Sequence, residues 1–436
     1  MRVISDDLKS RLVAALDNFP DIVASLSLFP NYLNGSANRP VGVAVSGGGD
    51  SVALLLLLWL WGRRPLHVFT VDHGINPMSA DWAQGVRDLS ERLGLAASVL
   101  HWTGEKPSRG VQAAARRARH GLILRLARTA DIRVVCLGHN ADDAAEAAAM
   151  RAEGSSVGDP RLWSPAPLWP EGAGVFYFRP LMAVRRQRLR DWLRVAGVTY
   201  VDDPANENPA YLRARVRQQG VVPSAPIPAV NAEESAPYVL PCEPSETREV
   251  AGEAPPEGAF FRVATLPPAD ILSALIVCAG GGEKLPRQAE VVRILDGAGR
   301  GVTRFTLCGA RIAAAGDGWL ICREPGDMMR KGAGPLLCGD IWDGRFRLPS
   351  YAFEAEMAYD ILPAKGRLTR LPAADQARLK PLPPAVRAAL PVLKRGESVR
   401  LFPAGELQDL TRNRLRSALG LIGCEADINC PELPVA

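Results

Sequence analysis

A turn of three consecutive glycines between a serine and an Asp-Ser pair constrains the fold of this chain most strongly. The hexapeptide Ser46-Gly47-Gly48-Gly49-Asp50-Ser51 joins an apolar run at 41–45 to a leucine-rich run at 52–58. Glycine permits positive φ angles and close approach to an anion, and a following helix directs free N–H groups at the same point. The segment therefore predicts a strand, a polyphosphate-binding turn and a helix. An ordinary tight turn with Asp50 as a local helix cap is the alternative.

Two common nucleotide-binding loops do not match this turn. It lacks the lysine of the G-x-x-x-x-G-K-[ST] loop, which contacts the β- and γ-phosphates, and it lacks the spacing of the G-x-G-x-x-G dinucleotide fingerprint. The predicted anion site must therefore belong to another class of phosphate loop.

Short apolar segments alternate with longer helical patterns between residues 40 and 200. This order predicts an α/β fold in which a parallel sheet has helices on both faces. Ligands bind such sheets at the carboxyl ends of the strands, so we expect functional residues directly after each strand. The expected strands cover residues 41–45, 66–71, 97–101 and 134–137, and the expected helices begin at 51, 80, 111 and about 141.

Acidic motifs follow two of these strands. Asp72-His73 comes after the second strand, where a local hydrogen bond explains the pair as well as a binding role does. After the last predicted strand, helical spacing would place four polar side chains on one face: His139, Asp142, Asp143 and Glu146. Helix capping is one explanation for these acids. Carboxylates that share a face repel unless a cation joins them, and Mg²⁺ with phosphates or a substrate ammonium group would serve.

These motifs resemble a known family. The glycine-rich hexapeptide is similar to the S-G-G-x-D-S loop of the PP-loop ATP pyrophosphatases, and Val71-Asp72-His73-Gly74-Ile75 resembles the V-D-H-G-[LI] element of their tRNA(Ile)-lysidine synthetase branch. The acidic segment resembles that branch's H-H-x-D-D-Q-A-E-T motif. This chain departs from the motif at Asn140, Ala144 and Ala147, which puts the contribution of the missing groups in doubt.

Three further segments extend the resemblance to residues 38–218. The helix pattern at 110–120 resembles E-A-A-A-R-x-x-R-Y, with Arg116 and Arg119 matching. Arg179-Pro180-Leu181 resembles R-P-L. The segment at 201–217 resembles W-x-x-D-P-(S/A)-N followed by R-x-R-x-R, with Arg213, Arg215 and Arg217 as its arginines.

The resemblance implies a two-step ligase. ATP would adenylate O2 of the wobble cytidine of a tRNA(Ile) with a CAU anticodon, and the ε-amine of free lysine would then displace AMP to give lysidine. The implied catalytic residues are Asp50, Asp143, Glu146, Arg116, Arg213 and Arg215. The implied nucleotide-binding residues are Ser46, Gly47, Gly48, Gly49, Asp50, Ser51, Asp72, His73 and His139. The implied Mg²⁺ ligands are Asp50, Asp142 and Asp143.

Composition places few limits on this function. The formal net charge of +5 over 436 residues permits nucleic-acid binding without requiring it. The eight cysteines form no C-x-x-C motif, which favours reduced thiols. Residues 1–18 carry charges within their apolar pattern, unlike a signal peptide, and the apolar run at 54–61 is too short to span a bilayer. We expect a cytoplasmic protein with no membrane association, and the sequence leaves its oligomeric state open.

The second half of the chain is less informative. We expect a PP-loop catalytic domain at 1–220, a Pro- and Glu-rich linker at 221–260, a small α+β module at 261–335 and a C-terminal module at 336–436. The last two would either dock tRNA or support folding of the catalytic domain. Docking is suggested by basic residues that alternate with apolar ones: Arg287, Arg293, Arg300, Arg304 and Arg311.

Two other functions remain open from the residues alone. A PP-loop tRNA thiolase would use the same adenylation but deliver sulfur, and it is disfavoured because only Cys136 lies in the catalytic half. A non-catalytic RNA-binding protein with a degenerate loop is the second alternative, which the departures at Asn140, Ala144 and Ala147 keep open.

Overall fold

The computed structural model describes residues 2–155, 160–167, 172, 174–203, 212–218, 220, 259–282, 285–330, 341–349, 359–419 and 422–428. The chain forms two compact units, one built from Met1–Ala236 with Ile422–Ala436 and the other from Pro237–Leu421. The predicted linker at 221–260 lies outside the described residues except for 259 and 260. The predicted domain boundaries at 220, 260 and 335 stay predictions.

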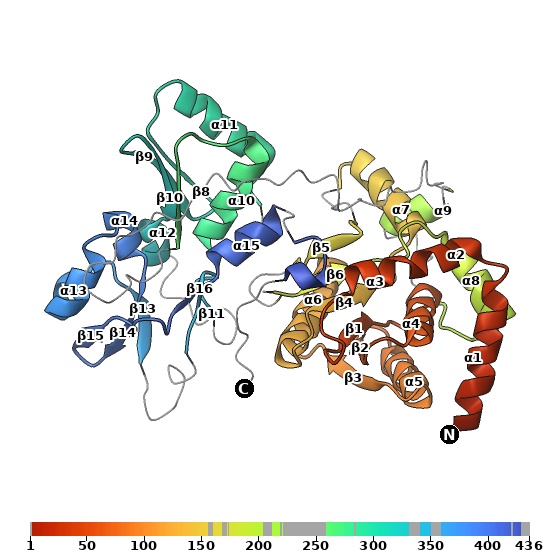
Figure 1. Cartoon of the computed structure of the whole chain (residues 1–436). Coiled ribbons are helices and arrows are strands. Elements are labelled where there is room, and N and C mark those ends of the chain that lie inside the picture. Colours follow the sequence, from red (N-terminus) through yellow and green to blue (C-terminus); the bar gives the residue numbers. More distant parts are fainter. Residues whose placement is uncertain are drawn as a thin grey trace. The chain divides into compact units, whose positions relative to one another are not determined.

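A six-stranded sheet forms the centre of the N-terminal unit, with the strand order β3-β2-β1-β4-β6-β5 (Figure 1). All neighbours pair in parallel except β5 and β6, which are antiparallel. The strands are β1 (Val41–Ala44), β2 (Leu66–Asp72), β3 (Ala96–His101), β4 (Val134–Leu137), β5 (Trp163–Pro165) and β6 (Phe176–Phe178). The sequence pattern missed β5 and β6, because three residues are too few to show a periodicity.

Helices cover both faces of this sheet, as the sequence predicts. Alternate residues of β4 join different apolar clusters: Val134 and Cys136 pack with one group of helices, and Val135 and Leu137 pack with another. The first cluster holds α4 (Gly49–Trp61), α5 (Ser79–Arg92) and α8 (Arg186–Val195), and the second holds α6 (Val111–Thr129). Successive side chains of a buried parallel strand point to opposite faces of the sheet, so β4 packs against helices on both faces.

Helix α4 carries the most apolar run of the chain, and the structure buries it. Residues from Val52 to Leu58 are all almost fully inaccessible, packed against the sheet and α8. Among the described residues no single helix is long and apolar enough to cross a membrane. One bent pair, Asp7–Leu16 with Pro20–Tyr32, meets such a test by length and composition only, at a bend of 110°.

The first and last described segments both belong to the N-terminal unit. Helices α1 (Arg2–Leu16), α2 (Pro20–Leu26) and α3 (Leu28–Tyr32) contribute Leu12, Ile22 and Phe29 to its core. Residues 422–428, which the sequence pattern groups with the C-terminal module, also pack here. Ile422 and Ile428 join the same core, and Glu425 forms a buried ion pair with Arg64.

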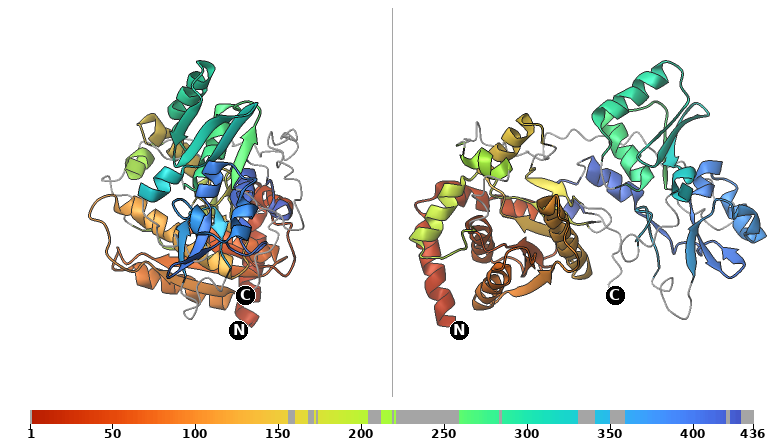
Figure 2. Two further views of the ribbon diagram at one scale, coloured as in Figure 1. Left: turned by 90° about the vertical axis from the view of Figure 1, so that its left-hand side faces the viewer. Right: turned by 180° about the vertical axis from the view of Figure 1, so that it is seen from behind.

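The C-terminal unit contains a four-stranded antiparallel sheet within the α+β module predicted at 261–335. Its strand order is β7-β10-β9-β8, with α10 (Ala269–Gly280) and α11 (Gln288–Gly299) on one side (Figure 2). The strands are β7 (Phe260–Val263), β8 (Arg304–Leu307), β9 (Ala310–Ala315) and β10 (Gly318–Arg323).

Two three-stranded sheets complete this unit. One has the order β11-β12-β16 and the other β13-β14-β15. Their strands are β11 (Ile341–Trp342), β12 (Phe346–Arg347), β13 (Asp360–Pro363), β14 (Pro391–Arg395), β15 (Ser398–Arg400) and β16 (Gln408–Asp409). The unit's remaining α-helices are α12 (Pro325–Arg330), α13 (Ala373–Leu379), α14 (Pro384–Ala388) and α15 (Thr411–Ala418).

The second run of three glycines, at 280–282, has a packing role. Gly281 ends α10 with a left-handed φ of 68°, and a Cβ atom there would collide with the backbone oxygen of Asp343. A residue with a side chain would therefore separate α10 from the β11–β12 turn. No strand leads into this run, in contrast to Ser46–Ser51.

Candidate active site

The glycine-rich turn leads directly from β1 into α4. Gly47 has a φ of 88°, which a side chain would disfavour, and Gly48 is the N-cap residue of the helix. The Ser51 hydroxyl accepts a hydrogen bond from the Ser46 amide at 3.1 Å and donates one to the Gly48 carbonyl at 2.9 Å. The turn is thus closed by its own serines. In the first turn of α4 the Ser51 and Val52 amides donate to the Gly48 carbonyl at 3.1 and 3.0 Å, and the amides of Gly49 and Asp50 precede the first helical acceptor.

Asp50 lies in that first turn and has one buried oxygen without a partner. Its Oδ2 atom accepts a hydrogen bond from Nε of Arg186 at 3.2 Å. Its Oδ1 atom is buried and has no hydrogen-bond partner among the described residues. Burial raises the pKa of Asp50 and the charge of Asp143 adds to this, although Arg186 acts in the opposite direction. A cation at Oδ1 would offset this unfavourable burial.

The acidic motif forms the start of α7 (Ala141–Ala152), as the sequence predicts. Asn140 is the N-cap residue, and its Oδ1 accepts hydrogen bonds from the amides of Asp142 and Asp143. Asp143 Oδ2 accepts from the Asn140 amide at 2.9 Å and completes a capping box. Asn140, which departs from the family motif, therefore caps the start of this helix. Ala147, another departure from the motif, is buried on the same helix.

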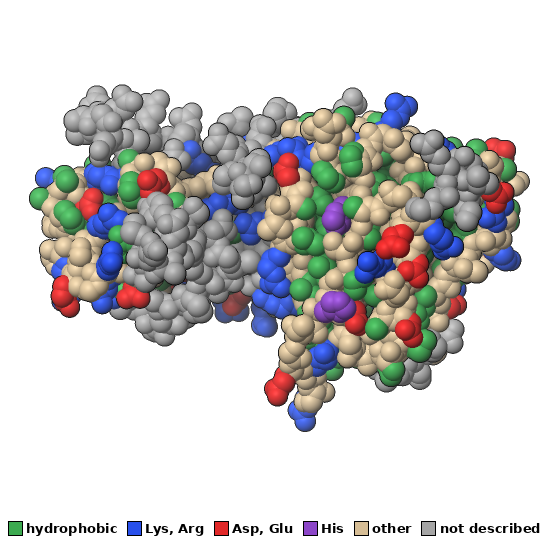
Figure 3. All heavy atoms as spheres, turned by 90° about the horizontal axis from the view of Figure 1, so that it is seen from below, with side chains coloured by type: hydrophobic (Ala, Val, Ile, Leu, Met, Phe, Trp, Pro, Cys, Tyr) green, Lys and Arg blue, Asp and Glu red, His purple; other side chains and the backbone are tan. Residues whose placement is uncertain are grey.

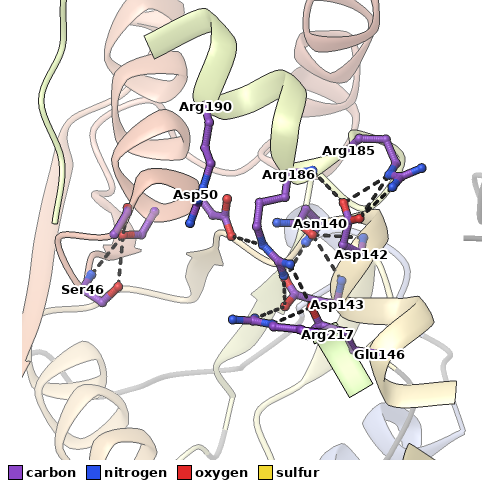
Figure 4. A network of polar contacts seen from close by, with 12 residues as sticks. Ser46, Asp50, Asn140, Asp142, Asp143, Glu146, Arg185, Arg186, Arg190 and Arg217 are labelled. Atoms are coloured by element: carbon purple, nitrogen blue, oxygen red, sulfur yellow. Dashed lines mark hydrogen bonds and ion pairs between the residues drawn. The ribbon is translucent and has the colours of Figure 1, made fainter. Parts of the chain in front are cut away.

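Three arginines donate hydrogen bonds to the carboxylates of Asp143 and Glu146, and two of them, Arg186 and Arg217, are labelled in Figure 4. Glu146 Oε1 accepts hydrogen bonds from Nη1 of Arg186 at 2.8 Å and Nε of Arg217 at 2.7 Å, and its Oε2 accepts from Nε of Arg213 at 2.7 Å. Asp143 Oδ1 accepts from Nη2 of Arg186 at 3.1 Å and from Nη2 of Arg213 at 2.6 Å. We call these five side chains the carboxylate–arginine cluster.

The cluster is assembled from three helices that are distant in sequence. Arg186 is the first residue of α8, whereas Arg213 and Arg217 lie four positions apart on α9 (Leu212–Gln218), which packs against α7. That spacing places both guanidinium groups on one face of the helix. Arg186 also reaches Asp50, so it connects the acidic helix with the glycine-rich turn.

Charge pairing dominates the protonation of this cluster. Burial acts to raise the pKa of Glu146, but the hydrogen bond from Arg217 and the charges of Arg213 and Arg186 outweigh it, so the pKa lies below its ordinary value. Burial likewise acts to lower the pKa of Arg186, but Asp143, Glu146 and Asp50 raise it overall. The pairing therefore favours the charged forms of both Glu146 and Arg186.

Asp142 does not face the cluster. Its carboxylate accepts hydrogen bonds from Nε of Arg185 at 3.1 Å and from the Arg186 amide at 2.7 Å, and Figure 4 shows it directed toward Arg185. Asp50, Asp142 and Asp143 are therefore not brought together as a ligand set. Within the described part of the chain, no group of three or more His, Cys, Asp or Glu side chains could hold a metal ion.

The other sequence-predicted residues are more scattered. Asp72 accepts local hydrogen bonds from the Gly74 amide at 2.8 Å and the Ser79 hydroxyl at 2.6 Å, as its structural explanation anticipates. His73 and His139 each have a buried Nδ1 without a partner among the described residues. Burial, followed by nearby arginine charges, lowers the pKa of both histidines, so both are neutral at pH 7.

Two other predicted arginines lie on α6 and α9. Desolvation and the charge of Arg213 lower the pKa of Arg116 on α6. Arg215 lies on the exposed side of α9, between the two arginines that reach Glu146. Sequence reasoning did not assign Arg186 or Arg217 to the site. The only signals were the arginine-rich helix after Arg179-Pro180-Leu181 and the third arginine of R-x-R-x-R.

Comparisons with known proteins show the family of this chain. A family model described as a PP-loop domain matches residues 23–224. A tRNA(Ile)-lysidine synthase from Caulobacter vibrioides is 40% identical over 416 residues, covering 90% of this chain and 96% of the relative. The chain belongs to the tRNA(Ile)-lysidine synthase family.

Further relatives extend over less of the chain. The tRNA(Ile)-lysidine synthase of Ruegeria pomeroyi is 37% identical over 331 residues, covering 71% of this chain and 76% of the relative. Among solved structures, a U34-tRNA thiolase from Methanococcus maripaludis with its [4Fe-4S] cluster matches 46% of this chain and 72% of its own. Its sequence identity is 19% and its TM-score is 0.39.

On the face of the N-terminal unit seen in Figure 3, acidic and basic side chains are interspersed among apolar ones over much of the surface. The carboxylate–arginine cluster and the adjoining turn are the strongest candidate site among the described residues.

Proposed function

We propose that this chain attaches lysine to C2 of the wobble cytidine of a tRNA(Ile) with a CAU anticodon, using ATP and releasing AMP and pyrophosphate. The observation that carries the proposal is Arg186, which joins the Asp50 end of the glycine-rich turn to Asp143 and Glu146. The support for the proposal is that one side chain links the residues proposed to bind phosphate with those proposed to bind the amine, in a chain 40% identical to a lysidine synthase.

The turn is the part of the site suited to the pyrophosphate of ATP. Ser46, Gly47, Gly48, Gly49 and Ser51 surround the N-terminus of α4, where N–H groups and the helix dipole favour negative charge. Because the serines already fix the loop conformation, little ordering would be needed when the nucleotide binds. His73 and His139 stay candidates for nucleotide contacts because each has an unused buried nitrogen.

Mg²⁺ fits one position in this site. The unpartnered Oδ1 of Asp50 is the atom most in need of a cation, and Mg²⁺ commonly binds through one or two carboxylates together with substrate phosphates. Asp50 would hold the ion, with Asp143 as the nearest further acid of the cluster. The ion would neutralise charge on the phosphates of ATP. Asp142 is less suited to this role because it is paired with Arg185.

The reaction joins two substitutions. First, cytidine O2 bonds to the α-phosphorus of ATP as the bond from that phosphorus to the pyrophosphate oxygen breaks. Next, the lysine ε-nitrogen bonds to C2, the C2–O2 bond breaks, and AMP leaves with the O2 oxygen while the nitrogen loses its extra proton. Asp143 and Glu146 would hold the amine, and Arg116, Arg213 and Arg215 would stabilise the phosphate or the lysine carboxylate. Catalysis would come from positioning and charge, with no covalent enzyme intermediate.

The C-terminal unit is proposed to dock tRNA. Arg293, Arg300 and Arg304 are exposed there. Arg311 is committed to an ion pair with Glu324, with Nε to Oε2 at 2.7 Å. The remaining exposed arginines could contact the phosphate backbone. Action on tRNA is also what places the protein in the cytoplasm in this proposal.

Labelled lysine tests the proposed function. The protein is incubated with Mg²⁺-ATP and a tRNA(Ile) transcript with a CAU anticodon, and in parallel with a methionine tRNA that has the same anticodon. We expect label in the isoleucine tRNA alone. No label in either tRNA, with AMP still released, would show the adenylating activity but refute lysine as the nucleophile. No AMP release at all would favour the non-catalytic alternative.

A further inference from the structure

The oxygens proposed to receive the substrate amine are already occupied by the chain's own cations. Glu146 accepts hydrogen bonds from guanidinium groups at both oxygens, and Asp143 Oδ1 accepts two more. The second oxygen of Asp143 is used by the Asn140 amide. Each carboxylate thus accepts three of the roughly four hydrogen bonds that it can accept, so a substrate ammonium group would compete with the guanidinium groups for the same oxygens.

The ion pairs within the site balance in formal charge. Asp50, Asp143 and Glu146 supply three negative charges, and the arginines paired with them, Arg186, Arg213 and Arg217, supply three positive charges. An ammonium group that joined Glu146 while all three guanidinium groups stayed in place would add a fourth positive charge to these three carboxylates, which is unfavourable in a partly buried site. Binding of an amine is therefore coupled to the release of one arginine.

The three arginines differ in how firmly they are held. Arg186 contacts three carboxylates, its side chain is 17% exposed, and it begins a ten-residue helix anchored by the buried Trp192. Arg213 is the most exposed of the three at 38%, but it makes two close ion pairs, with Glu146 and Asp143 at 2.7 and 2.6 Å. Arg217 has one close contact, Nε to Glu146 Oε1 at 2.7 Å, and stands 3.9 Å from Asp143, with 29% of its side chain exposed. Arg217 is the arginine released at least cost.

We propose that Arg217 occupies the amine position of the site and competes with the ε-ammonium group of lysine for Glu146. The inference rests on the proposed function, because it takes lysine as the amine that binds there. Arg217 thereby sets the lysine concentration that the enzyme requires. An amine that makes weaker contacts elsewhere in the site would not displace the Arg217 guanidinium, so Arg217 also disfavours such amines.

Lysine affinity in Arg217 variants tests this competition. Arg217→Gln and Arg217→Ala remove the cation, and both should lower the Kd for lysine by about three- to tenfold, because the amine no longer replaces an ion pair. Arg217→Lys keeps a cation and should stay close to the native Kd. Equilibrium dialysis with labelled lysine, in the presence of tRNA and a non-hydrolysable ATP analogue, measures the Kd without turnover. The KM for lysine, measured separately from kcat, should move in the same direction.

A matched control lies on α8. Arg188 pairs with Asp21 at 2.9 Å, away from the cluster, so Arg188→Gln should leave the lysine Kd unchanged. Native-like thermal unfolding of the variants establishes that they are folded, and the Gln and Ala changes provide two independent removals of the charge.

Three outcomes decide the matter. Tighter lysine binding in the Gln and Ala variants, with Arg217→Lys close to native, supports the competition. An unchanged or higher Kd in both neutral variants overturns it, as does an Arg217→Lys variant that binds lysine as tightly as they do. Native protein that binds no lysine at all would instead refute the proposed function itself.

Discussion

Two clusters of arginine and carboxylate side chains, one in each unit, use the same residue types in opposite arrangements. In the N-terminal cluster the acids are buried, with Glu146 at 4% and Asp143 at 9% side-chain exposure, and the arginines extend toward solvent. In the C-terminal unit the arginines are buried instead, with Arg345 at 2% and Arg323 at 5%. The two clusters therefore differ in which partner is buried, and so in which side chain a ligand could displace.

The C-terminal cluster is closed by the backbone. Arg345 donates from Nε to Asp343 at 2.8 Å and from Nη2 to the Ala389 carbonyl at 2.7 Å, and Arg323 donates to Asp343, Asp327 and the Gly309 carbonyl. Carbonyl partners fix these guanidinium groups where a ligand has no access. The contrast indicates that exposed arginines over buried acids suit a binding site, and buried arginines suit a structural joint.

The largest expected effect concerns this structural joint. Asp343→Asn keeps the side-chain shape and tolerates the left-handed backbone at φ 51°, but it leaves the charges of Arg323 and Arg345 poorly compensated. We expect the free energy of unfolding to fall by about 3–5 kcal/mol, as measured by denaturant titration. The lysine KM of the folded protein should not change. A loss below about 0.5 kcal/mol would contradict the proposed difference between the two clusters, because the ion pairs of this cluster would then contribute little to stability.

The second prediction tests whether the role of an ion pair depends on its burial rather than on the unit that contains it. Arg64 and Glu425 form an ion pair in the N-terminal unit with both side chains almost fully buried. Glu425→Gln should therefore behave like a structural change and lower the free energy of unfolding by about 3 kcal/mol. Thermal unfolding of the full chain measures it. Reduced lysine affinity without reduced stability would contradict the burial criterion.

The third prediction concerns Asp50. D50N should reduce the rate of lysine transfer by about a hundredfold, because the carboxylate proposed to hold Mg²⁺ is lost. Stability should not fall. The raised pKa of Asp50 means that the folded state disfavours its charged form, so any stabilisation is present at low pH and is lost as pH rises through the folded pKa.

The control measures the rate of lysine transfer and the free energy of unfolding in the same preparation of D50N. At neutral pH the free energy of unfolding of D50N should equal or exceed that of the native chain. Retained lysine transfer at native rate, or a large loss of stability, would each argue against a ligand-binding role for this carboxylate.

The smallest expected effect is a pH dependence in the C-terminal unit. The Arg311 hydrogen bond, partly opposed by burial, lowers the pKa of Glu324 below its ordinary value. The pair therefore stabilises the fold above the unfolded pKa of about 4.3, and this stabilisation is lost as pH falls through the lowered folded pKa. Arg311→Met should cost about 0.5–1 kcal/mol at neutral pH and flatten the acid dependence. Denaturant titrations at several pH values measure both, and an unchanged acid dependence would contradict the assignment.

The sequence predicted the parts of the fold that depend on local pattern. The strands at β1, β2, β3 and β4 and the helices after them follow from apolar periodicity and the glycine-rich turn, and the acidic start of α7 follows from capping chemistry. Strands β5 and β6 were missed because they are three residues long, and the pairing that defines them is made across the sheet.

The missing site residues depend on tertiary contacts. Arg186 and Arg217 looked like members of ordinary basic helices, since many nearby arginines share their spacing. What distinguishes them is tertiary: α9 packs against α7, and Arg186 at the start of α8 forms ion pairs with Asp143 and Glu146 of α7, whereas Arg215 is exposed. The tail at 422–428 was misplaced for the same reason, because nothing local signals that Glu425 meets Arg64, 361 positions away.

The proposed function is tested most directly by the identity of the nucleoside at the wobble position after the reaction. The tRNA(Ile) product is digested to nucleosides and analysed by mass spectrometry, with lysine and Mg²⁺-ATP present in the reaction. We predict that the wobble cytidine is replaced by a nucleoside carrying lysine at C2 in place of its oxygen. Unmodified cytidine, or sulfur at C2 instead of lysine, would contradict it.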